Sequence, residues 1–225
     1  MKNNVDDAVA KRNRANNRTI QFFLKRLFDV VTSLLILIAL SPIFLLLAMW
    51  IILDDGLPVF YKQKRSGIHN TVFQMYKFRS MKNKQIPVPS NSHPYDEWND
   101  GVPDDFVFKL PSEDNPNITR VGRFIRKYSL DELPQFINVL KGDMSIIGPR
   151  PEILDITEHY NERQKERLKV LPGITGWAQV NGRSNMNHGE KIHHDLYYVH
   201  HFNLWLDVKI FFKTIYQVIG GKDSA

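Results

Sequence analysis

The longest hydrophobic pattern in the chain is an uncharged apolar run near the amino terminus, from Val30 to Leu53. A straight helix over this run would extend roughly 36 Å, slightly more than a hydrocarbon core of about 30 Å. Ser41 and Pro42 interrupt the run near its middle, because proline removes a backbone hydrogen bond and clashes with the preceding turn. Two structures fit this pattern: a kinked transmembrane helix, or a helical hairpin that enters and leaves the membrane by the same face.

Basic residues flank the apolar run on both sides. Seven precede it within residues 1–26, and seven more follow within residues 54–84. The positive-inside rule therefore assigns no strong orientation, and equal basicity is expected of a chain with both ends in the cytoplasm. Residues 1–24 are polar and basic and are expected to form a flexible arm. Lys25 and Arg26 adjoin the run and are candidates for anionic headgroup contacts, at about 1 kcal/mol each.

Downstream of the run, short segments rich in aromatic and β-branched residues predict a β-hairpin. The segments are residues 57–63 and 71–78, with turn-like residues between them. Lys77 and Arg79 lie two positions apart at the end of the second segment and would share one strand face. They are candidate phosphate contacts, although an ordinary solvated strand face fits the same spacing.

The rest of the pattern predicts mainly helices. A helix from Pro134 to about Lys141, ended by Gly142, fits the preference of proline for the first helical position and of glycine for the end. Further helical segments are expected at residues 152–170, 189–202 and 203–219. The last one is amphipathic, so it would pack on its own domain or lie on a membrane surface. The expected fold is α+β and mainly helical.

A long loop is expected between the hairpin and the next helices. Residues 83–118 are rich in Pro, Asn, Asp and Ser, with Trp98 and Phe106 as isolated apolar anchors. Loops of this length are often functional lids or variable insertions. We expect a surface loop that influences the choice of substrate.

Composition narrows the chemistry. The chain of 225 residues has no cysteine, which excludes a disulfide framework and a thiolate site. Its net charge of +6 indicates an anionic partner: nucleic acid, anionic lipid or a phosphorylated substrate. The histidines near residues 193–201 complete no strong metal motif, so exposed helix histidines are expected there rather than a zinc site.

The candidate chemistry lies in the stretch from Arg120 to Arg150. Four bases crowd upstream of a carboxylate pair, Asp131 and Glu132, and Arg150 follows in a rigid Gly-Pro-Arg-Pro turn. Guanidinium groups bind phosphate with a planar fork, and a carboxylate among them stays ionised and can bind a metal or attack phosphorus. The stretch therefore predicts a phosphate-handling site.

A purely structural interpretation of the same residues is equally compatible with the spacing. Ser129 and Glu132 match a capping box, Ser-x-x-Glu, at the start of a helix. Pro134 would then lie inside the helix, beyond the first turn that tolerates it. If the helix begins at Pro134 instead, Asp131 and Glu132 lie just before its amino terminus, which favours negative charge.

Six motifs in a fixed order resemble the monotopic polyprenyl-phosphate phosphoglycosyl transferases, a family of bacterial sugar transferases. The resemblance covers about residues 25–214. The motifs are Lys-Arg-Leu-Phe-Asp before the Ser-Pro-broken run, Tyr-Lys-Phe-Arg-Ser-Met, Arg-Lys-x-Ser-Leu-Asp-Glu-Leu-Pro-Gln, Gly-Pro-Arg-Pro, Pro-Gly-Ile-Thr-Gly-Trp-Ala-Gln-Val-Asn-Gly-Arg and Trp-x-Asp-x-Lys-Ile. Each motif alone is weak, but the ordered set is specific.

The resemblance implies an architecture and a location. Residues 25–54 would form a re-entrant membrane helix bent at Ser41 and Pro42, and residues 55–225 a cytosolic catalytic domain. Surface amphipathic helices and the hairpin would belong to that domain. The protein would reside at the bacterial inner membrane, with the catalytic domain on the cytosolic face and phospholipids as neighbours.

The resemblance also implies a reaction with residue roles. Sugar-1-phosphate would move from a UDP-sugar to undecaprenyl phosphate, with release of UMP. Asp131 would be the nucleophile and a ligand of Mg²⁺, and Glu132 would position or deprotonate the lipid phosphate. The residues matching phosphate- or substrate-binding positions are Lys77, Arg126, Arg150 and Asp207, together with the strand-face candidate Arg79.

Other functions remain compatible with parts of the sequence. A glycosyltransferase that moves the sugar alone would release UDP instead of UMP. A membrane-tethered scaffold or nucleic-acid binder would use the basic charge, but regular aromatic stacking positions are missing and the Asp-Glu pair would have no role. We therefore expect no nucleic-acid partner. A homodimer is compatible with the sequence, which names neither the sugar nor the glycan pathway.

Overall fold

The computed structural model describes residues 2–83, 98, 100–107, 115–182 and 186–219. Helices dominate and two small sheets complete the fold, which confirms the mainly helical α+β prediction. The helices are α1 (Lys2–Ala39), α2 (Ser41–Asp55), α3 (Arg120–Lys127), α4 (Gln135–Lys141), α5 (Leu154–Thr157), α6 (Glu162–Lys165), α7 (Trp177–Asn181), α8 (His188–His200) and α9 (Leu204–Ile219). Short 3₁₀ turns are η1 (Ile68–Asn70), η3 (Leu130–Glu132) and η4 (Glu166–Lys169).

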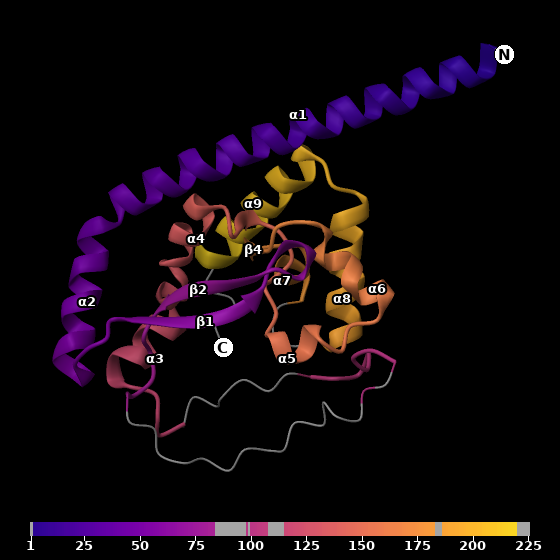
Figure 1. Cartoon of the computed structure of the whole chain (residues 1–225). Helices are drawn as coiled ribbons and strands as arrows, with labels where there is room; N and C mark the ends of the chain where they lie inside the picture. Colours follow the sequence, from indigo (N-terminus) through magenta and orange to yellow (C-terminus); the bar gives the residue numbers. More distant parts are fainter. Residues whose placement is uncertain (1, 84–97, 99, 108–114, 183–185, 220–225) are drawn as a thin grey trace.

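The predicted break in the apolar run is confirmed. α1 ends at Ala39 and α2 begins at Ser41, with Pro42 in the first turn of α2, where its missing N–H leaves no bond unmade. The Ser41 hydroxyl donates to the Ile38 carbonyl at 2.8 Å. The two helices meet at an angle of 60°, visible at the upper left of Figure 1. Among the described helices, none alone has the length and apolarity of a membrane span, whereas Arg18–Ala39 and Ser41–Asp55 taken together do.

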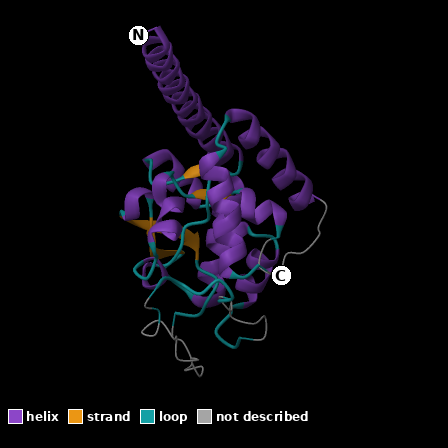
Figure 2. Cartoon of the chain, turned by 90° about the vertical axis from the view of Figure 1, so that its right-hand side faces the viewer, coloured by secondary structure: helices purple, strands orange, loops and turns teal. Residues whose placement is uncertain are grey.

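The amino-terminal segment differs from the expected flexible arm. Residues 2–24 belong to α1, which runs without a break from Lys2 to Ala39 and projects beyond the rest of the protein (Figure 2). Neither glycine nor proline occurs before Pro42, so nothing in this stretch interrupts helix propagation. The basic residues that suggested a flexible arm therefore belong to a helix.

Polar side chains on one face of α1 bind it to the rest of the protein. Lys25 Nζ donates to the Ile147 carbonyl at 2.9 Å and to Asp207 Oδ2 at 2.7 Å. One turn later, the buried Asp29 accepts the backbone N–H of Ile146 at 3.0 Å. These contacts bind α1 to a short strand, β3 (Ser145–Ile147), and to α9.

Arg26 makes a second attachment, to the end of α4. Its guanidinium donates to the carbonyls of Val139 and Leu140 in the last turn of α4, at 2.6 and 3.0 Å. The Val139 carbonyl also accepts the backbone N–H of Gly142, at 3.1 Å. Lys25 and Arg26 thus bind within the protein, which corrects their expected contact with lipid headgroups.

The predicted β-hairpin is confirmed with a shifted first strand. β1 (Phe60–Ser66) pairs with β2 (Val72–Phe78) in antiparallel fashion, with Phe60 opposite Phe78 and Ser66 opposite Val72. A second sheet consists of β3 (Ser145–Ile147) and β4 (Gly173–Thr175), which are parallel. The main apolar cluster lies between these strands and the helices α4, α8 and α9, and it includes Met75, Val139, Met144, Tyr198 and Ile210.

Two other predicted segments are only partly regular. Residues 152–170 form α5, α6 and η4 rather than one helix, because Asn161 starts a new helix with a capping box. Within the expected 83–118 loop, residues 84–97, 99 and 108–114 lie outside the described residues. The anchors Trp98 and Phe106 pack together, with ring centroids 4.8 Å apart, against a third apolar cluster.

Candidate active site

The carboxylate pair lies in a short turn between two helices. Ser129 adopts a left-handed conformation with φ of 54° after α3, and η3 then carries Asp131 and Glu132. Pro134 precedes α4, and Gly142 ends it with φ of 90°. The predicted helix is therefore confirmed, whereas Ser129 makes no capping bond. The reversal at Ser129 turns both carboxylates toward β2 and the Gly-Pro-Arg-Pro turn.

Glu132 joins two of the predicted cations. Its Oε1 accepts from Lys77 Nζ at 2.9 Å and from Arg150 at 2.6 Å. The Glu132 side chain is 18% exposed, and the Arg150 side chain is 52% exposed. Although burial opposes ionisation, Arg150 and Lys77 together hold the pKa of Glu132 far below its usual range. The same contact raises the pKa of Arg150, so Glu132 and Arg150 are both ionised at neutral pH.

Asp131 has a different environment from its neighbour. It is partly buried, and among the described residues no side chain forms a hydrogen bond or an ion pair with its carboxylate. Burial raises the pKa of Asp131, and the charge of Glu132 raises it further, while Lys77, Arg126 and Arg150 lower it. The cations are thus near enough to lower the pKa of Asp131, although none of the three forms a hydrogen bond or an ion pair with its carboxylate. A carboxylate in this state is free to meet an incoming ligand.

Arg126 approaches the pair from α3. Its Nε donates to the Ser80 hydroxyl at 3.0 Å, which orients the guanidinium beside the dyad. The structure therefore brings together five of the candidate site residues, Asp131, Glu132, Lys77, Arg126 and Arg150. Chemically, this arrangement can bind a phosphate group between cations and present it to the unpaired Asp131 carboxylate.

Backbone hydrogen bonds fix the main chain on both sides of Arg150. Gly148 N–H donates to Thr175, and Gly173 N–H donates to Pro149, each at 2.8 Å. A Cβ on Gly173 would collide with the backbone of Gly148, so only glycine allows this approach. The carbonyl of Glu152 accepts the N–H of a residue at the end of β1. The Pro-Gly-Ile-Thr-Gly motif therefore serves to fix the Gly-Pro-Arg-Pro turn.

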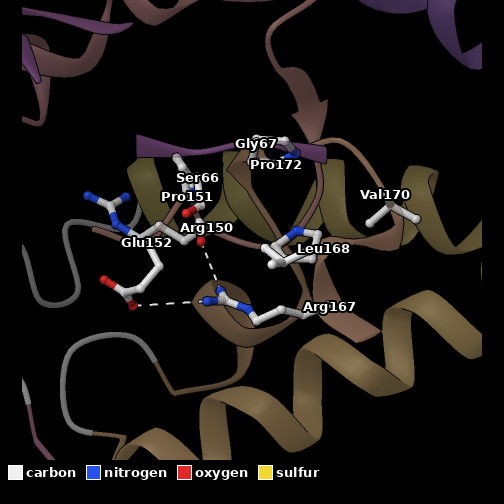
Figure 3. Close-up of a pocket in the computed structure, with 10 residues that line it drawn as sticks. Ser66, Gly67, Arg150, Pro151, Glu152, Arg167, Leu168, Val170 and Pro172 are labelled. Atoms are coloured by element: carbon white, nitrogen blue, oxygen red, sulfur yellow. Dashed lines mark hydrogen bonds and ion pairs between the residues drawn. The ribbon is translucent and has the colours of Figure 1, made fainter. Parts of the chain in front are cut away.

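A buried arginine completes this support, and the sequence did not single it out. Arg167 donates to the Arg150 carbonyl at 2.8 Å and to the Tyr160 hydroxyl at 2.7 Å. Its charge is balanced by Asp195 at 2.7 Å, with side chains only 5% and 2% exposed. Figure 3 shows the Arg167 guanidinium between the main chain at Arg150 and the carboxylate of Glu152. The cavity beside it, about 10 Å³, is too small for a sugar nucleotide.

A sequence signal for Arg167 and Asp195 was weak. Each lies in a helical segment where charged residues are common, and the acceptor of Arg167 is a backbone carbonyl that no side-chain pattern reveals. The one available signal was proximity of Arg167 to the Pro-Gly-Ile-Thr-Gly motif.

Two predicted binding residues lie elsewhere. Arg79 is 6% exposed and donates to the carbonyls of Asp55 and Gly56 at the end of α2. β2 ends at Phe78, so Arg79 does not share the strand face of Lys77. Asp207 accepts from Lys25 and from the Tyr198 hydroxyl at 2.8 Å, within the α1 attachment. Arg79 is thus a structural contact of α2 and Asp207 one of α1, rather than neighbours of the dyad.

The described residues offer a limited set of metal ligands. They contain no group of three or more His, Asp or Glu side chains that could hold a metal ion. Glu132 is occupied by Lys77 and Arg150, whereas no side chain of the described residues pairs with the Asp131 carboxylate. One free carboxylate beside a phosphate-binding site is the donor set that Mg²⁺ commonly uses, with substrate phosphates and waters as its other ligands.

The chain is similar to known proteins of one family. Residues 20–221 match the family model described as bacterial sugar transferase. The chain is 43% identical to the undecaprenyl-phosphate galactose phosphotransferase of Salmonella typhimurium over 90% of its own length. It is 39% identical to the exopolysaccharide production protein ExoY of Sinorhizobium fredii, over 92% of the chain and 90% of that relative.

A third relative is the UDP-glucose:undecaprenyl-phosphate glucose-1-phosphate transferase of Escherichia coli, 40% identical over 86% of the chain. The chain spans only 42% of the Salmonella relative and 40% of the Escherichia coli relative. The similarity therefore covers one part of these two longer proteins and nearly all of ExoY.

Proposed function

This chain belongs to the bacterial sugar transferase family, and from that premise we propose that it is a phosphoglycosyl transferase. It moves sugar-1-phosphate from a UDP-sugar to undecaprenyl phosphate and releases UMP. The names of the Salmonella and Escherichia coli relatives support both the lipid acceptor and the class of sugar donor. The reaction would be the first membrane step in the synthesis of an exopolysaccharide, a capsule or another glycoconjugate.

The proposed chemistry divides one transfer into two displacements at the same phosphorus. An oxygen of Asp131 attacks the β-phosphorus of the UDP-sugar, and the bond from that phosphorus to the bridging oxygen breaks, so UMP leaves. A phosphate oxygen of the lipid then attacks the β-phosphorus. The bond to Asp131 breaks, which restores the carboxylate and yields the lipid diphosphate sugar. Covalent catalysis of this kind replaces one difficult step with two easier ones.

The cations have distinct roles in this proposal. Lys77, Arg126 and Arg150 bind the transferring phosphoryl group and stabilise the charge that develops on it. Glu132 holds Lys77 and Arg150 in place, and its lowered pKa makes it a weak base. That environment favours positioning by Glu132 over deprotonation of the lipid phosphate. Asp131 would also hold Mg²⁺, which when bound neutralises charge on the diphosphate.

The proposed location follows from the surface of the bent helix pair. Large apolar side chains along α1 and α2 are exposed, among them Leu35 (61%), Ile38 (63%), Leu45 (69%) and Leu46 (63%). Soluble proteins rarely expose continuous apolar surface of this kind. We place α1 and α2 in the cytoplasmic leaflet of the inner membrane as a re-entrant hairpin, with the dyad at headgroup level on the cytosolic side.

The observation that carries the proposal is the contrast between the two carboxylates. Glu132 is paired with Lys77 and Arg150, while no described side chain pairs with Asp131, although the same cations act on it electrostatically. A purely structural acidic pair would not require one member to remain unpaired in a partly buried position, where an unpaired charge is costly.

UMP release from UDP-sugars in the presence of undecaprenyl phosphate tests the proposal. With the UDP-sugar alone, mass spectrometry of the protein should detect an adduct of one sugar phosphate on Asp131. Asp131→Asn should lose both the adduct and turnover. Release of UDP instead of UMP would indicate a transferase that moves the sugar alone, and full activity of Asp131→Asn would exclude Asp131 as the nucleophile.

A further inference from the structure

Helix α3 is fixed to the end of α2, where the bent helix pair joins the rest of the protein. Asp54 Oδ2 accepts the backbone N–H of Val121 in the first turn of α3 at 3.1 Å. The rings of Trp50 and Phe124 meet with centroids 5.3 Å apart, and apolar side chains of both helices share one cluster. The orientation of α3 therefore follows that of α2.

The outward face of α3 is basic and aromatic. Arg120, Arg123, Phe124, Lys127 and Tyr128 follow the helical spacing that places them on one side, and all five are exposed. None of the three cations forms an ion pair with a described residue, although Lys127 lies 5.7 Å from the centre of the Tyr128 ring. The opposite face, with Val121 and Ile125, is fully buried.

This face continues the exposed apolar surface of α2. Leu53 is 82% exposed and Trp50 is 44% exposed at the end of α2, next to Phe124 at 42%. Aromatic rings that border an apolar surface are typical of the membrane–water interface, and cations beside them lie at the level of the phosphates. By contrast, Lys25 and Arg26 at the entrance of the helix pair are bound within the protein.

We propose that the outward face of α3 binds the headgroups of anionic phospholipids. The inference rests on the proposed placement of α1 and α2 in the membrane. Charge complementarity and continuity with the α2 surface favour this occupant. Each interfacial cation strengthens binding to an anionic surface by about 5-fold, the equivalent of about 1 kcal/mol. Because α3 leads directly into η3, the bound headgroups would also set the height of Asp131 above the membrane.

The test counts lipids retained by the full chain. The protein is reconstituted in nanodiscs of mixed phosphatidylcholine and phosphatidylglycerol, and native mass spectrometry measures the lipids that remain bound. The triple variant Arg120→Gln, Arg123→Gln, Lys127→Gln is compared with a control of equal charge change, Arg163→Gln, Lys165→Gln, Lys169→Gln. The control residues lie on α6 and η4, on the side of the protein opposite α2 in Figure 1.

The wild type and the control should retain phosphatidylglycerol in preference to phosphatidylcholine, and the α3 variant should lose most of that preference. Equal preference in all three proteins would overturn the proposal. So would an increased KM for undecaprenyl phosphate in the α3 variant in phosphatidylcholine alone, since the face would then be the acceptor site. Asp131→Asn should retain phosphatidylglycerol normally, so a failure of the proposed chemistry is distinguishable from a failure of this inference.

Arg167 is buried next to the Gly-Pro-Arg-Pro turn. Its burial with Asp195 and its bond to the Arg150 carbonyl place a costly charge beneath the phosphate-binding turn. We infer that Arg167 is a positioning residue: it holds the turn so that the Arg150 guanidinium meets Glu132 and the phosphoryl group. Lysine cannot reach Asp195, Tyr160 and the carbonyl together, because it lacks the planar fork.

A double-mutant cycle with Arg150 tests this role. Arg167→Lys should reduce kcat roughly 10-fold in the wild type with a smaller change in the KM for the UDP-sugar. In an Arg150→Gln background the same substitution should cost less than about 2-fold, since the group it positions is gone. Equal losses in both backgrounds would show that Arg167 acts on overall stability alone and would overturn the inference.

Discussion

Asp131 and Glu132 are adjacent in the chain, yet their carboxylates have opposite environments. Glu132 accepts from two cations, and its ionised form is stabilised. Asp131 is partly buried and has no ion-pair or hydrogen-bond partner among the described side chains, and its ionised form is disfavoured. Both side chains leave the same turn, η3, and it is the Glu132 carboxylate that reaches Lys77 and Arg150. The contrast leads to opposite predictions for the two residues.

Replacing Asp131 with asparagine should stabilise the protein while abolishing turnover. The raised pKa of Asp131 means that its ionisation at neutral pH costs stability in the folded state. Thermal unfolding in detergent with EDTA should show a Tm higher by roughly 2–4 °C. The gain should diminish as the pH falls and Asp131 itself becomes neutral. The control Asp155→Asn, at an exposed position, should leave the Tm nearly unchanged.

Replacing Glu132 with glutamine should have the opposite effect on stability. The free energy of unfolding should fall by roughly 1–3 kcal/mol, toward the lower end because Arg150 is half-exposed. Since folding lowers the pKa of Glu132, this contribution is present above pH 4.5, its ordinary value, and is lost as the pH falls further. The free energy of unfolding of the wild type and of Glu132→Gln should therefore differ at neutral pH and become similar below pH 4.5. A Glu132→Gln protein as stable as the wild type at neutral pH would contradict it.

At the scale of elements, the ends of helices decide which charges are available for chemistry. The carbonyls at the end of α4 are bound by Arg26, and those at the end of α2 by Arg79. Asp54 pairs with the first turn of α3. Each of these bonds joins a charged side chain to a backbone group at the first or last turn of a helix, where the backbone pairing is incomplete. They also join the bent helix pair to the turn that carries the dyad.

Arg79 provides a test of this assignment. Arg79→Met should lower the free energy of unfolding by about 3 kcal/mol, because the carbonyls and the Asp55 carboxylate lose a buried partner. If Arg79 does not bind substrate, the KM for the UDP-sugar should stay within about 2-fold at temperatures where the variant is folded. Lys64→Met, at an exposed position on the same hairpin, is the control for lost charge. A large increase in KM without loss of stability would restore Arg79 as a phosphate contact.

At the scale of the whole molecule, a group of buried polar contacts joins α1 to β3 and α9. Lys25 and Asp207 pair with side chains 11% and 10% exposed, and Tyr198 and Asp29 border them. The Ile147 carbonyl, also bound by Lys25, immediately precedes the Gly-Pro-Arg-Pro turn. The position of the bent helix pair is thereby coupled to the position of Arg150.

The membrane topology is a prediction at this scale. If α1 and α2 form a re-entrant hairpin, reporters fused to either end of the chain should both be active in the cytoplasm. A transmembrane path through the same 60° bend would place the ends on opposite sides. Reporter activity at each terminus distinguishes the two, with a fusion of known periplasmic location as the positive control for export.

The sequence alone determined the local features. Pro134 and Gly142 defined α4, Pro42 defined the break between α1 and α2, and aromatic and β-branched residues defined the hairpin. These signals are local because they depend on the backbone geometry of a few neighbouring residues. The cations of the site were also recognised, since Lys77, Arg126 and Arg150 belong to motifs with a characteristic spacing.

Only the tertiary structure decided which charges meet. It paired Lys25 with Asp207, far apart in the chain, and moved both Asp207 and Arg79 out of the candidate site. It also placed Arg167 beneath Arg150, through a backbone carbonyl that has no signature in the sequence. Ion pairs and hydrogen bonds depend on distances of about 3 Å, and the folded path of the chain sets these distances, whereas spacing along the sequence does not.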